Sequence, residues 1–279
     1  MRHHAVWLGL ILFGALSLWW AGSRPDRSYT RIDGAAFATS YQITYAGGED
    51  RNNVQRAVDE QLSRIDAMAS TWRSDSELMR YNRVEHPPEF ELSDELAGLI
   101  EQGMQIEAQT DGAFSLRPNG RMIDLSGITK GYAVDRIVEL LRNKFKITDC
   151  LVDIGGEVRA IGPGPHKDGW RIGLYVPMEA AGIDAPVLRL RNNSVATSGA
   201  YFKGDHIIDP STGRPVDHDL ISASVVHPSN TKADALATAM FVMGPERGLM
   251  WARANNIHVI LLHKNNQRSE HIPGTPRDK

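Results

Sequence analysis

The stretch "IDLSGITKGYAVDR", residues 123–136, joins a short polar turn to an apolar pattern of helical period. Asp124, Gly127 and Lys130 stand where that helix is expected to begin. A helix start has unpaired backbone N–H groups and a partial positive charge, so it can hold an anion. The lysine adds a full positive charge. The stretch therefore predicts an anion site at a helix entrance, with a phosphate as the first ligand to consider.

Composition sets the class of the protein. The chain has 279 residues, of which 42% are hydrophobic and 23% are charged, as in an ordinary globular protein. Its formal net charge is −3, and no stretch of the chain is strongly basic. This charge pattern argues against a nucleic-acid partner. The single cysteine, Cys150, lies in an apolar run and is expected to be a buried small hydrophobic residue.

The N-terminus differs from the rest of the chain. Residues 5–22, "AVWLGLILFGALSLWWAG", form an uncharged run that is near the lower limit for a membrane span. The run is apolar on every side, which disfavours the alternative of a buried helix. We therefore expect a signal peptide or membrane anchor at 1–23 and a polar linker at 24–33. The remainder is expected on the periplasmic side of the inner membrane.

The rest of the chain mixes helical and strand patterns without strict βαβ alternation. Apolar spacing predicts helices at 52–68, capped by Asn52 or Asn53, and at 93–109, opened by Ser93. The polar stretch at 70–83, after the first of these helices, is expected to be a loop. Further helices are expected after residue 129 and on both sides of Gly244. Alternating segments predict strands near 40–48, 150–162, 170–176, 186–191, 193–199, 221–227 and 257–263. The pattern predicts one α+β domain, with a mixed or antiparallel sheet and packed helices, over residues 34–263, followed by a polar tail at 264–279.

Several residues have side chains suited to chemistry. Asp234 and Thr238 are four residues apart on an expected helix, so both project from one face, as oxygen ligands of Mg²⁺ would. The alternative is an acid and a threonine on a solvated face, but their neighbours are small and apolar. His206 and Asp209 in "GDHIIDPSTGRP" are candidates for a general base and for a ligand-orienting or turn-capping acid. Other signatures are absent, namely G-x-G-x-x-G, G-x-x-x-x-G-K-[ST], H-E-x-x-H and G-x-S-x-G.

Four longer motifs, in the same order along the chain, resemble those of the ApbE family, the FAD:protein FMN transferases. "DLSGITKGYAVD" resembles D-L-G-G-[IA]-A-K-G-Y-A-V-D, and "LVDIGGEVRAIG" resembles L-V-N-I-G-G-E-[IV]-R-x-x-G. "SVATSGAYFKGDHIIDPSTGRP" resembles S-[VI]-A-T-S-G-[DN]-Y followed by H-I-I-D-P-x-T-G-x-P. "ADALATAMFVMG" resembles A-D-A-L-A-T-A-x-[FY]-[VL]-[ML]-G. The resemblance covers residues from about 34 to 244.

The resemblance implies an enzyme that binds FAD and Mg²⁺, attaches FMN to a threonine or serine of a partner redox protein, and releases AMP. It implies Mg²⁺ ligation by the Gly127 carbonyl, the Asp234 carboxylate and the Thr238 hydroxyl. It matches His206 to the histidine associated with transfer, with Asp209 as the second candidate for a catalytic role. The implied contacts to the flavin nucleotide are Phe37, Thr39, Trp72, Ala113, Phe114, Ser115, Asp124, Lys130 and Ile208.

Some positions depart from the family pattern. The family's M-G-T is "FAT" at residues 37–39, and its G-A-F-D-x-T is "GAFSLR", with Ser115 in place of an acid. Only nine residues separate Phe114 from Asp124, where relatives have a longer loop. The same residues would also serve Mg²⁺-dependent hydrolysis of FAD to FMN and AMP. A third alternative is a periplasmic flavin-binding protein that has lost transfer because of the shortened loop, although a protein that only binds flavin would not need the base His206.

Overall fold

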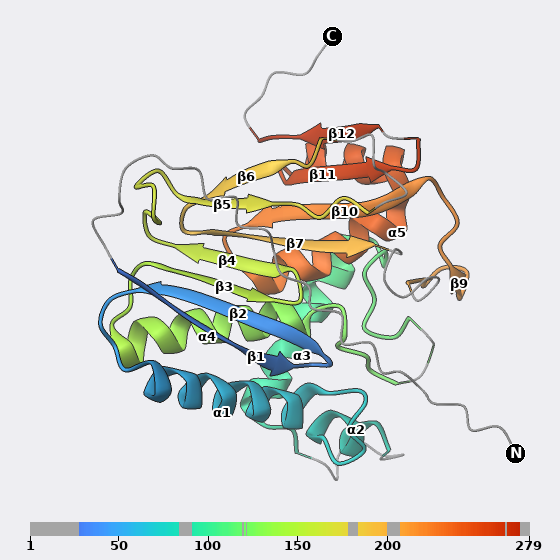
Figure 1. The fold of residues 1–279 in the computed structure, drawn as a ribbon. Coiled ribbons are helices and arrows are strands. Elements are labelled where there is room, and N and C mark those ends of the chain that lie inside the picture. Colours follow the sequence, from blue (N-terminus) through green and yellow to red (C-terminus); the bar gives the residue numbers. More distant parts are fainter. Residues whose placement is uncertain are drawn as a thin grey trace, which may run out of the picture.

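A computed structural model describes residues 28–83, 91–118, 120, 122–177, 184–199, 207–265 and 267–273. Its centre is an eight-stranded antiparallel sheet in the order β1-β2-β3-β4-β7-β10-β11-β12 (Figure 1). These strands are β1 (Tyr29–Ala36), β2 (Thr39–Ala46), β3 (Cys150–Ile154), β4 (Glu157–Ile161), β7 (Asn193–Gly199), β10 (Leu220–His227), β11 (His258–His263) and β12 (Arg268–His271). Two smaller ribbons pair β5 (Trp170–Gly173) with β6 (Val187–Leu190) and β8 (Ile208–Asp209) with β9 (Arg214–Pro215).

The helices gather on one side of the large sheet (Figure 1). They are α1 (Arg51–Ala69), α2 (Glu77–Asn82), α3 (Asp94–Gln109), α4 (Thr129–Phe145) and α5 (Asn230–Ala254). α4 packs on β3 and β4, and α5 packs on β7 and β10. Their apolar faces form the main core with the sheet. A second apolar cluster joins Trp170 and Leu190 of the β5–β6 ribbon to the large sheet, so its central strands are buried on both faces.

These features confirm the predicted α+β class with a largely antiparallel sheet. The helix expected at 93–109 is α3, and the Ser93 hydroxyl accepts a hydrogen bond from the Leu96 N–H as its cap. The helix expected at 52–68 is α1, but its cap is Asp50, not Asn52 or Asn53. The two helical segments around Gly244 form α5, in which Gly244 has a φ of 76° and Pro245 follows. Cys150 is buried in β3, and burial raises the pKa of its thiol to about 12.

Three expectations about the less apolar segments are wrong. The linker expected at 24–33 includes the start of β1, which pairs with β2 along its whole length from Tyr29. The polar tail expected from residue 264 includes β12, which pairs with β11. Both are edge strands of the sheet, and an edge strand needs few buried side chains, so its sequence reads as polar. The loop expected between α1 and α3 includes the short helix α2, capped by Ser76.

The predicted signal or anchor at 1–23 lies outside the described residues. Among the helices of the described part of the chain, none combines the length and the apolar character that a membrane crossing requires.

Candidate active site

One end of the large sheet gathers the segments that the sequence singled out. The two-residue turn at 37–38 joins β1 to β2, and the turn at 155–156 joins β3 to β4. They lie at the same end because Tyr41 of β2 pairs with Ile154 of β3. β7 ends and β10 begins at this end too, since β7 runs antiparallel to both β4 and β10. The predicted flavin contacts Phe37 and Thr39 are therefore at this end of the sheet.

The two turns differ in backbone strain. Gly155 and Gly156 have φ values of 63° and 97°, which glycine adopts without a steric penalty. Phe37 and Ala38 have φ values of 51° and 57°, where a side chain costs roughly 1–2 kcal/mol per residue. Backbone strain of this kind clusters at ligand-binding sites. The strained turn contains Phe37, one of the residues that the family resemblance implies in flavin contact.

The N-terminus of α4 meets α5 at Gly131. A Cβ atom at this position would lie 2.4 Å from the Asn230 carbonyl oxygen and 2.7 Å from the Asp234 Cβ, so no other residue fits without a shift of backbone. The close approach lets the Gly131 N–H donate to Asp234 Oδ2 at 2.9 Å. The start of α4 therefore bonds the chain's own Asp234 side chain, and the phosphate that the sequence predicts at this helix start stays a prediction.

The three residues that the family resemblance implies as metal ligands lie around this junction. Thr238 is one turn beyond Asp234 on α5, and a Cβ atom built on Gly127 would lie 3.4 Å from Thr238 Oγ1. The hydroxyls of Thr238 and Ser198 are hydrogen-bonded at 3.1 Å. No group of three or more His, Cys, Asp or Glu side chains in the described residues is arranged to hold a metal. The implied set instead combines one carboxylate with a hydroxyl and a backbone carbonyl.

Lys130, in the first turn of α4, has a buried partner that sequence reasoning missed. Its Nζ donates to Glu157 Oε1 at 2.6 Å, and Glu157, at the start of β4, is only 2% exposed. The sequence signal was available, because Glu157 is an acid that directly follows the Gly155-Gly156 turn and precedes apolar strand residues. Lys130 was expected to contact phosphate, and that role stays a prediction.

Acidic groups outnumber basic groups among these buried residues. Burial, reinforced by the neighbouring charge of Glu157, raises the pKa of the Asp234 carboxyl, and Lys130 opposes this rise. Burial likewise raises the pKa of Glu157 against the effect of Lys130. Glu157 Oε2 is buried, and no described group forms a hydrogen bond with it. A cluster of buried oxygen donors in which acids outnumber bases fits a hard divalent cation such as Mg²⁺, whose charge would favour the ionised acids.

Asp135 is a second buried acid that sequence reasoning missed as a positioning residue. Its carboxylate accepts hydrogen bonds from the Asn230 N–H at 2.9 Å and the Thr231 N–H at 3.0 Å, at the start of α5. The hydroxyls of Ser229 and Thr231 and the guanidinium of Arg159 also bind it. Asp135 on α4 therefore caps α5 and fixes the two helices where Gly131 meets Asp234. The final acid of "KGYAVD" was its only sequence signal.

The predicted flavin contacts on the α1–α4 segment fall into two kinds. Ala113 and Phe114 are buried in the core, and Phe114 lies beside Gly127. Trp72, in the loop after α1, is 88% exposed. Ser115 donates its hydroxyl to Glu107, and Asp124 accepts the Ser126 N–H within its own turn. The short loop between them is closed by a bond from the Asp124 N–H to the Leu116 carbonyl.

The segment after β7 contains the predicted catalytic residues. His206 lies outside the described residues. Ile208 and Asp209 form β8, and Asp209 Oδ1 accepts the N–H and hydroxyl of Ser211 at 2.8 and 2.7 Å. Of the two roles proposed for Asp209, these bonds match that of a turn cap.

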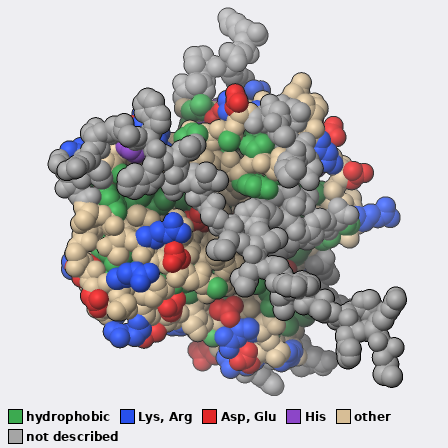
Figure 2. Space-filling model, viewed as in Figure 1, with side chains coloured by type: hydrophobic (Ala, Val, Ile, Leu, Met, Phe, Trp, Pro, Cys, Tyr) green, Lys and Arg blue, Asp and Glu red, His purple; other side chains and the backbone are tan. Residues whose placement is uncertain are grey.

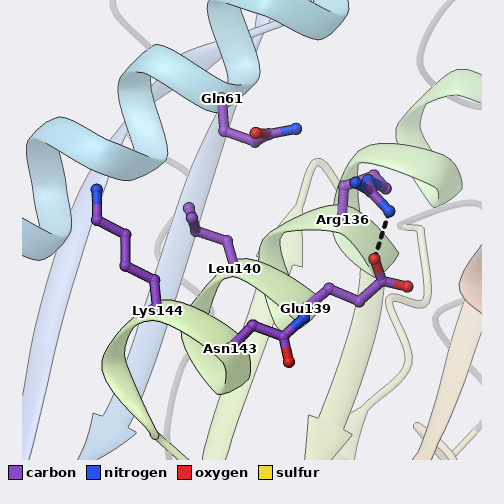
Figure 3. A pocket seen from close by; sticks show the side chains of 6 residues that line it. All are labelled: Gln61, Arg136, Glu139, Leu140, Asn143 and Lys144. Carbon is purple, nitrogen blue, oxygen red and sulfur yellow. Dashed lines mark hydrogen bonds and ion pairs between the residues drawn. The ribbon is translucent and has the colours of Figure 1, made fainter. Parts of the chain in front are cut away.

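A small surface hollow elsewhere contains none of the predicted site residues. It lies between α1 and α4, has a volume of about 140 Å³ and is lined by Gln61, Arg136, Glu139, Leu140, Asn143 and Lys144 (Figure 3). Arg136 is paired there with Glu139 at 2.5 Å. On the face drawn in Figure 2, acidic and basic side chains are interspersed. Neither feature competes with the α4–α5 junction as the candidate site.

Comparisons with known proteins agree with this arrangement. The model of the ApbE family matches residues 37–117 and 115–261. A FAD:protein FMN transferase of Vibrio cholerae is 29% identical over 304 residues, covering 88% of this chain and 90% of the relative. One from Treponema pallidum is 40% identical over 144 residues, covering 46% of this chain and 40% of the relative.

Solved structures show the same fold. The flavin transferase ApbE from Vibrio cholerae has a TM-score of 0.79 at 27% identity, covering 89% of this chain and 98% of that one. The apo flavinyl transferase ApbE of Pseudomonas stutzeri has a TM-score of 0.77 at 26% identity, covering 88% and 94%. Since the family model spans most of the chain, the protein belongs to the ApbE family.

Proposed function

We propose that this protein is an FAD:protein FMN transferase that uses Mg²⁺ to move FMN from FAD to a threonine or serine hydroxyl of a partner redox protein, releasing AMP. The observation that supports it most directly is the junction of α4 and α5. There, Gly127, Asp234 and Thr238 come together from segments that are far apart in sequence. The curated relatives from Vibrio cholerae and Escherichia coli have the same named activity.

The reaction breaks the phosphoanhydride bond of FAD and forms a phosphoester with the acceptor. The acceptor hydroxyl oxygen attacks the FMN phosphorus, the bond from that phosphorus to the AMP oxygen breaks, and the hydroxyl proton passes to a base. His206 is the proposed base, and Asp209 stabilises the turn that follows it. Such a base typically contributes about 10²–10⁴ in rate.

The remaining residues position the substrate. Gly127, Asp234 and Thr238 would hold Mg²⁺, which when bound neutralises charge on the diphosphate. Lys130 places a second positive charge in the first turn of α4. Trp72 offers an exposed ring on which the flavin or adenine can stack. The other proposed contacts to the flavin nucleotide are Phe37, Thr39, Ala113, Phe114, Ser115, Asp124 and Ile208.

The test is covalent flavinylation in vitro. The purified chain is incubated with FAD, MgCl₂ and a candidate redox protein, and AMP release and the mass of the redox protein are measured. We expect a mass gain of one FMN on a threonine or serine, and its loss in Asp234→Ala. Glu101→Gln, on the exposed face of α3, serves as the control and should retain full activity.

Other outcomes would contradict the proposal in distinct ways. AMP and free FMN without a modified acceptor would indicate FAD hydrolysis. Tight FAD binding without AMP would indicate a flavin-binding protein. If Asp234→Ala transferred FMN as well as the unaltered chain, the Asp234 carboxylate would not be a ligand of the cation.

We also propose that residues 1–23 anchor or export the chain to the periplasmic side of the inner membrane. The uncharged run at 5–22 supports this. Fractionation of cells that express the full chain, with protease added to spheroplasts, tests it: a chain that stays protected in the cytosolic fraction would contradict the proposal.

A further inference from the structure

Glu157 is held in a fixed position by the β3–β4 hairpin. It pairs with Ile154 directly across the turn at 155–156. A Cβ atom on Gly155 would lie 2.7 Å from Thr39 Cγ2, and the Gly155 N–H donates to the Ser40 carbonyl at 3.0 Å. The turn is therefore packed against β2, and the strand that begins with Glu157 has little freedom to move.

Among the described residues, only one of the two carboxylate oxygens of Glu157 has a hydrogen-bond partner. Oε1 accepts from Lys130 Nζ at 2.6 Å. Oε2 is buried, and none of the described residues donates to it. A buried polar atom without a partner destabilises the folded state, so native proteins rarely leave one without a functional reason.

The surrounding charges suggest what the carboxylate serves. Glu157 and Asp234 are both buried acids, and both contact the first turn of α4: Glu157 binds Lys130, and Asp234 binds the N–H of the next residue, Gly131. Lys130 contributes one positive charge to the pair. If both acids are ionised, two carboxylates and one ammonium have a net negative charge, which is costly to bury unless a cation offsets it. The predicted cation ligands Gly127 and Thr238 are at the same helix junction.

We propose that Glu157 is a further positioning residue of the divalent-cation site: it fixes Lys130 through Oε1 and contributes the charge of its unpaired Oε2 to cation binding. The inference rests on the proposed function, because it assumes a cation at Gly127, Asp234 and Thr238. In this role Glu157 would increase the affinity for the metal without being one of its ligands. Such residues typically change metal affinity by 10–100-fold when they are substituted.

The test measures Mn²⁺ binding directly, without FAD or turnover, from the electron paramagnetic resonance signal of free Mn²⁺ in titrations of the full chain. We expect Glu157→Gln to raise the Mn²⁺ Kd about 10–100-fold. Lys130→Met, which removes the competing positive charge, is expected to bind Mn²⁺ at least as tightly as the unaltered chain. Glu101→Gln serves as the control for a lost surface carboxylate and should bind unchanged.

The outcomes separate this inference from the function on which it rests. If Asp234→Asn weakens Mn²⁺ binding and Glu157→Gln does not, the role of Glu157 is wrong and the cation site stands. If the unaltered chain does not bind Mn²⁺, the cation site itself fails, and the role of Glu157 with it. Glu157→Asp keeps the charge and is expected to recover part of the lost affinity. If Glu157→Gln does not fold, the Mn²⁺ Kd of Glu157→Asp is measured instead. A Kd equal to that of the unaltered chain would then overturn the proposal.

Discussion

The α4–α5 junction is organised differently from the loop segments that contain Trp72, Ser115 and Asp209, which we call the rim. At the junction, Asp135 and Asp234 are buried and bonded to backbone N–H groups of the facing helix. At the rim, Trp72 is 88% exposed, and the side chains of Ser115 and Asp209 are bonded within their own segments. The proposed cation half of the site is therefore built into the core packing. Of the proposed flavin contacts, Ala113 and Phe114 are also buried, whereas Trp72 is not held in this way.

This difference has a physical consequence for affinity. A preorganised site loses little conformational freedom on binding, whereas exposed side chains must be ordered by the ligand. Changes at the junction should therefore alter folding stability as well as activity. Changes at the rim should alter FAD binding and leave stability nearly untouched.

The largest expected effect follows from removing Asp135. Asp135→Ala deletes the acceptor for the start of α5 and leaves Arg159, its ion-pair partner at 2.5 Å, without that carboxylate. Removing one partner of a buried ion pair costs about 3–5 kcal/mol. Urea denaturation followed by circular dichroism measures the loss in the free energy of unfolding.

Asp50→Ala is the matched control for that change. Asp50 also caps a helix, α1, but it is exposed, so its removal should cost about 1 kcal/mol. If Asp135→Ala lost no more stability than Asp50→Ala, the junction would not be better organised than the surface.

The junction also shows how far the sequence alone reaches. The periodicity of apolar residues predicted α1, α3 and α4, and a nearly continuous apolar run predicted α5, whose first half is buried on most sides. The residues Asp234 and Thr238 were identified from their spacing and apolar neighbours. Glu157 and Asp135 were not identified from the sequence. Glu157 acts through Lys130, which is 27 positions away in the chain, and Asp135 acts through Asn230, which is 95 positions away. A pattern within one segment does not contain such contacts.

The errors at the sheet edges have a different cause. β1 and β12 bury few side chains: Ile32 is the one fully buried residue of β1. Their strand structure comes from backbone pairing with β2 and β11, which the side-chain pattern does not report. The flavin-facing residues came from the family resemblance, and their geometry around a ligand stays a prediction.

A smaller effect is expected at Gly131. In Gly131→Ala the added Cβ atom would lie 2.4 Å from the Asn230 carbonyl oxygen, so α4 and α5 must separate. Overpacking of this kind typically costs about 1–3 kcal/mol in the free energy of unfolding. Gly98→Ala is the control, because a Cβ atom on Gly98 in α3 meets no atom within 4 Å. That change should stabilise the protein by roughly 0.5–1 kcal/mol. Equal stabilities of the two variants in urea would show that the helices do not touch at Gly131.

The smallest expected effect is at Trp72, and it is confined to binding. The side chain is 88% exposed, so Trp72→Ala should change the free energy of unfolding by less than about 0.5 kcal/mol. Loss of an aromatic stacking partner should raise the Kd for FAD about two- to tenfold, as measured by quenching of flavin fluorescence. Met250→Ala, which removes another exposed apolar side chain from α5, should leave the Kd unchanged. If Trp72→Ala lowered stability without changing the Kd, Trp72 would belong to the fold and not to the flavin site, and the contrast between junction and rim would fail.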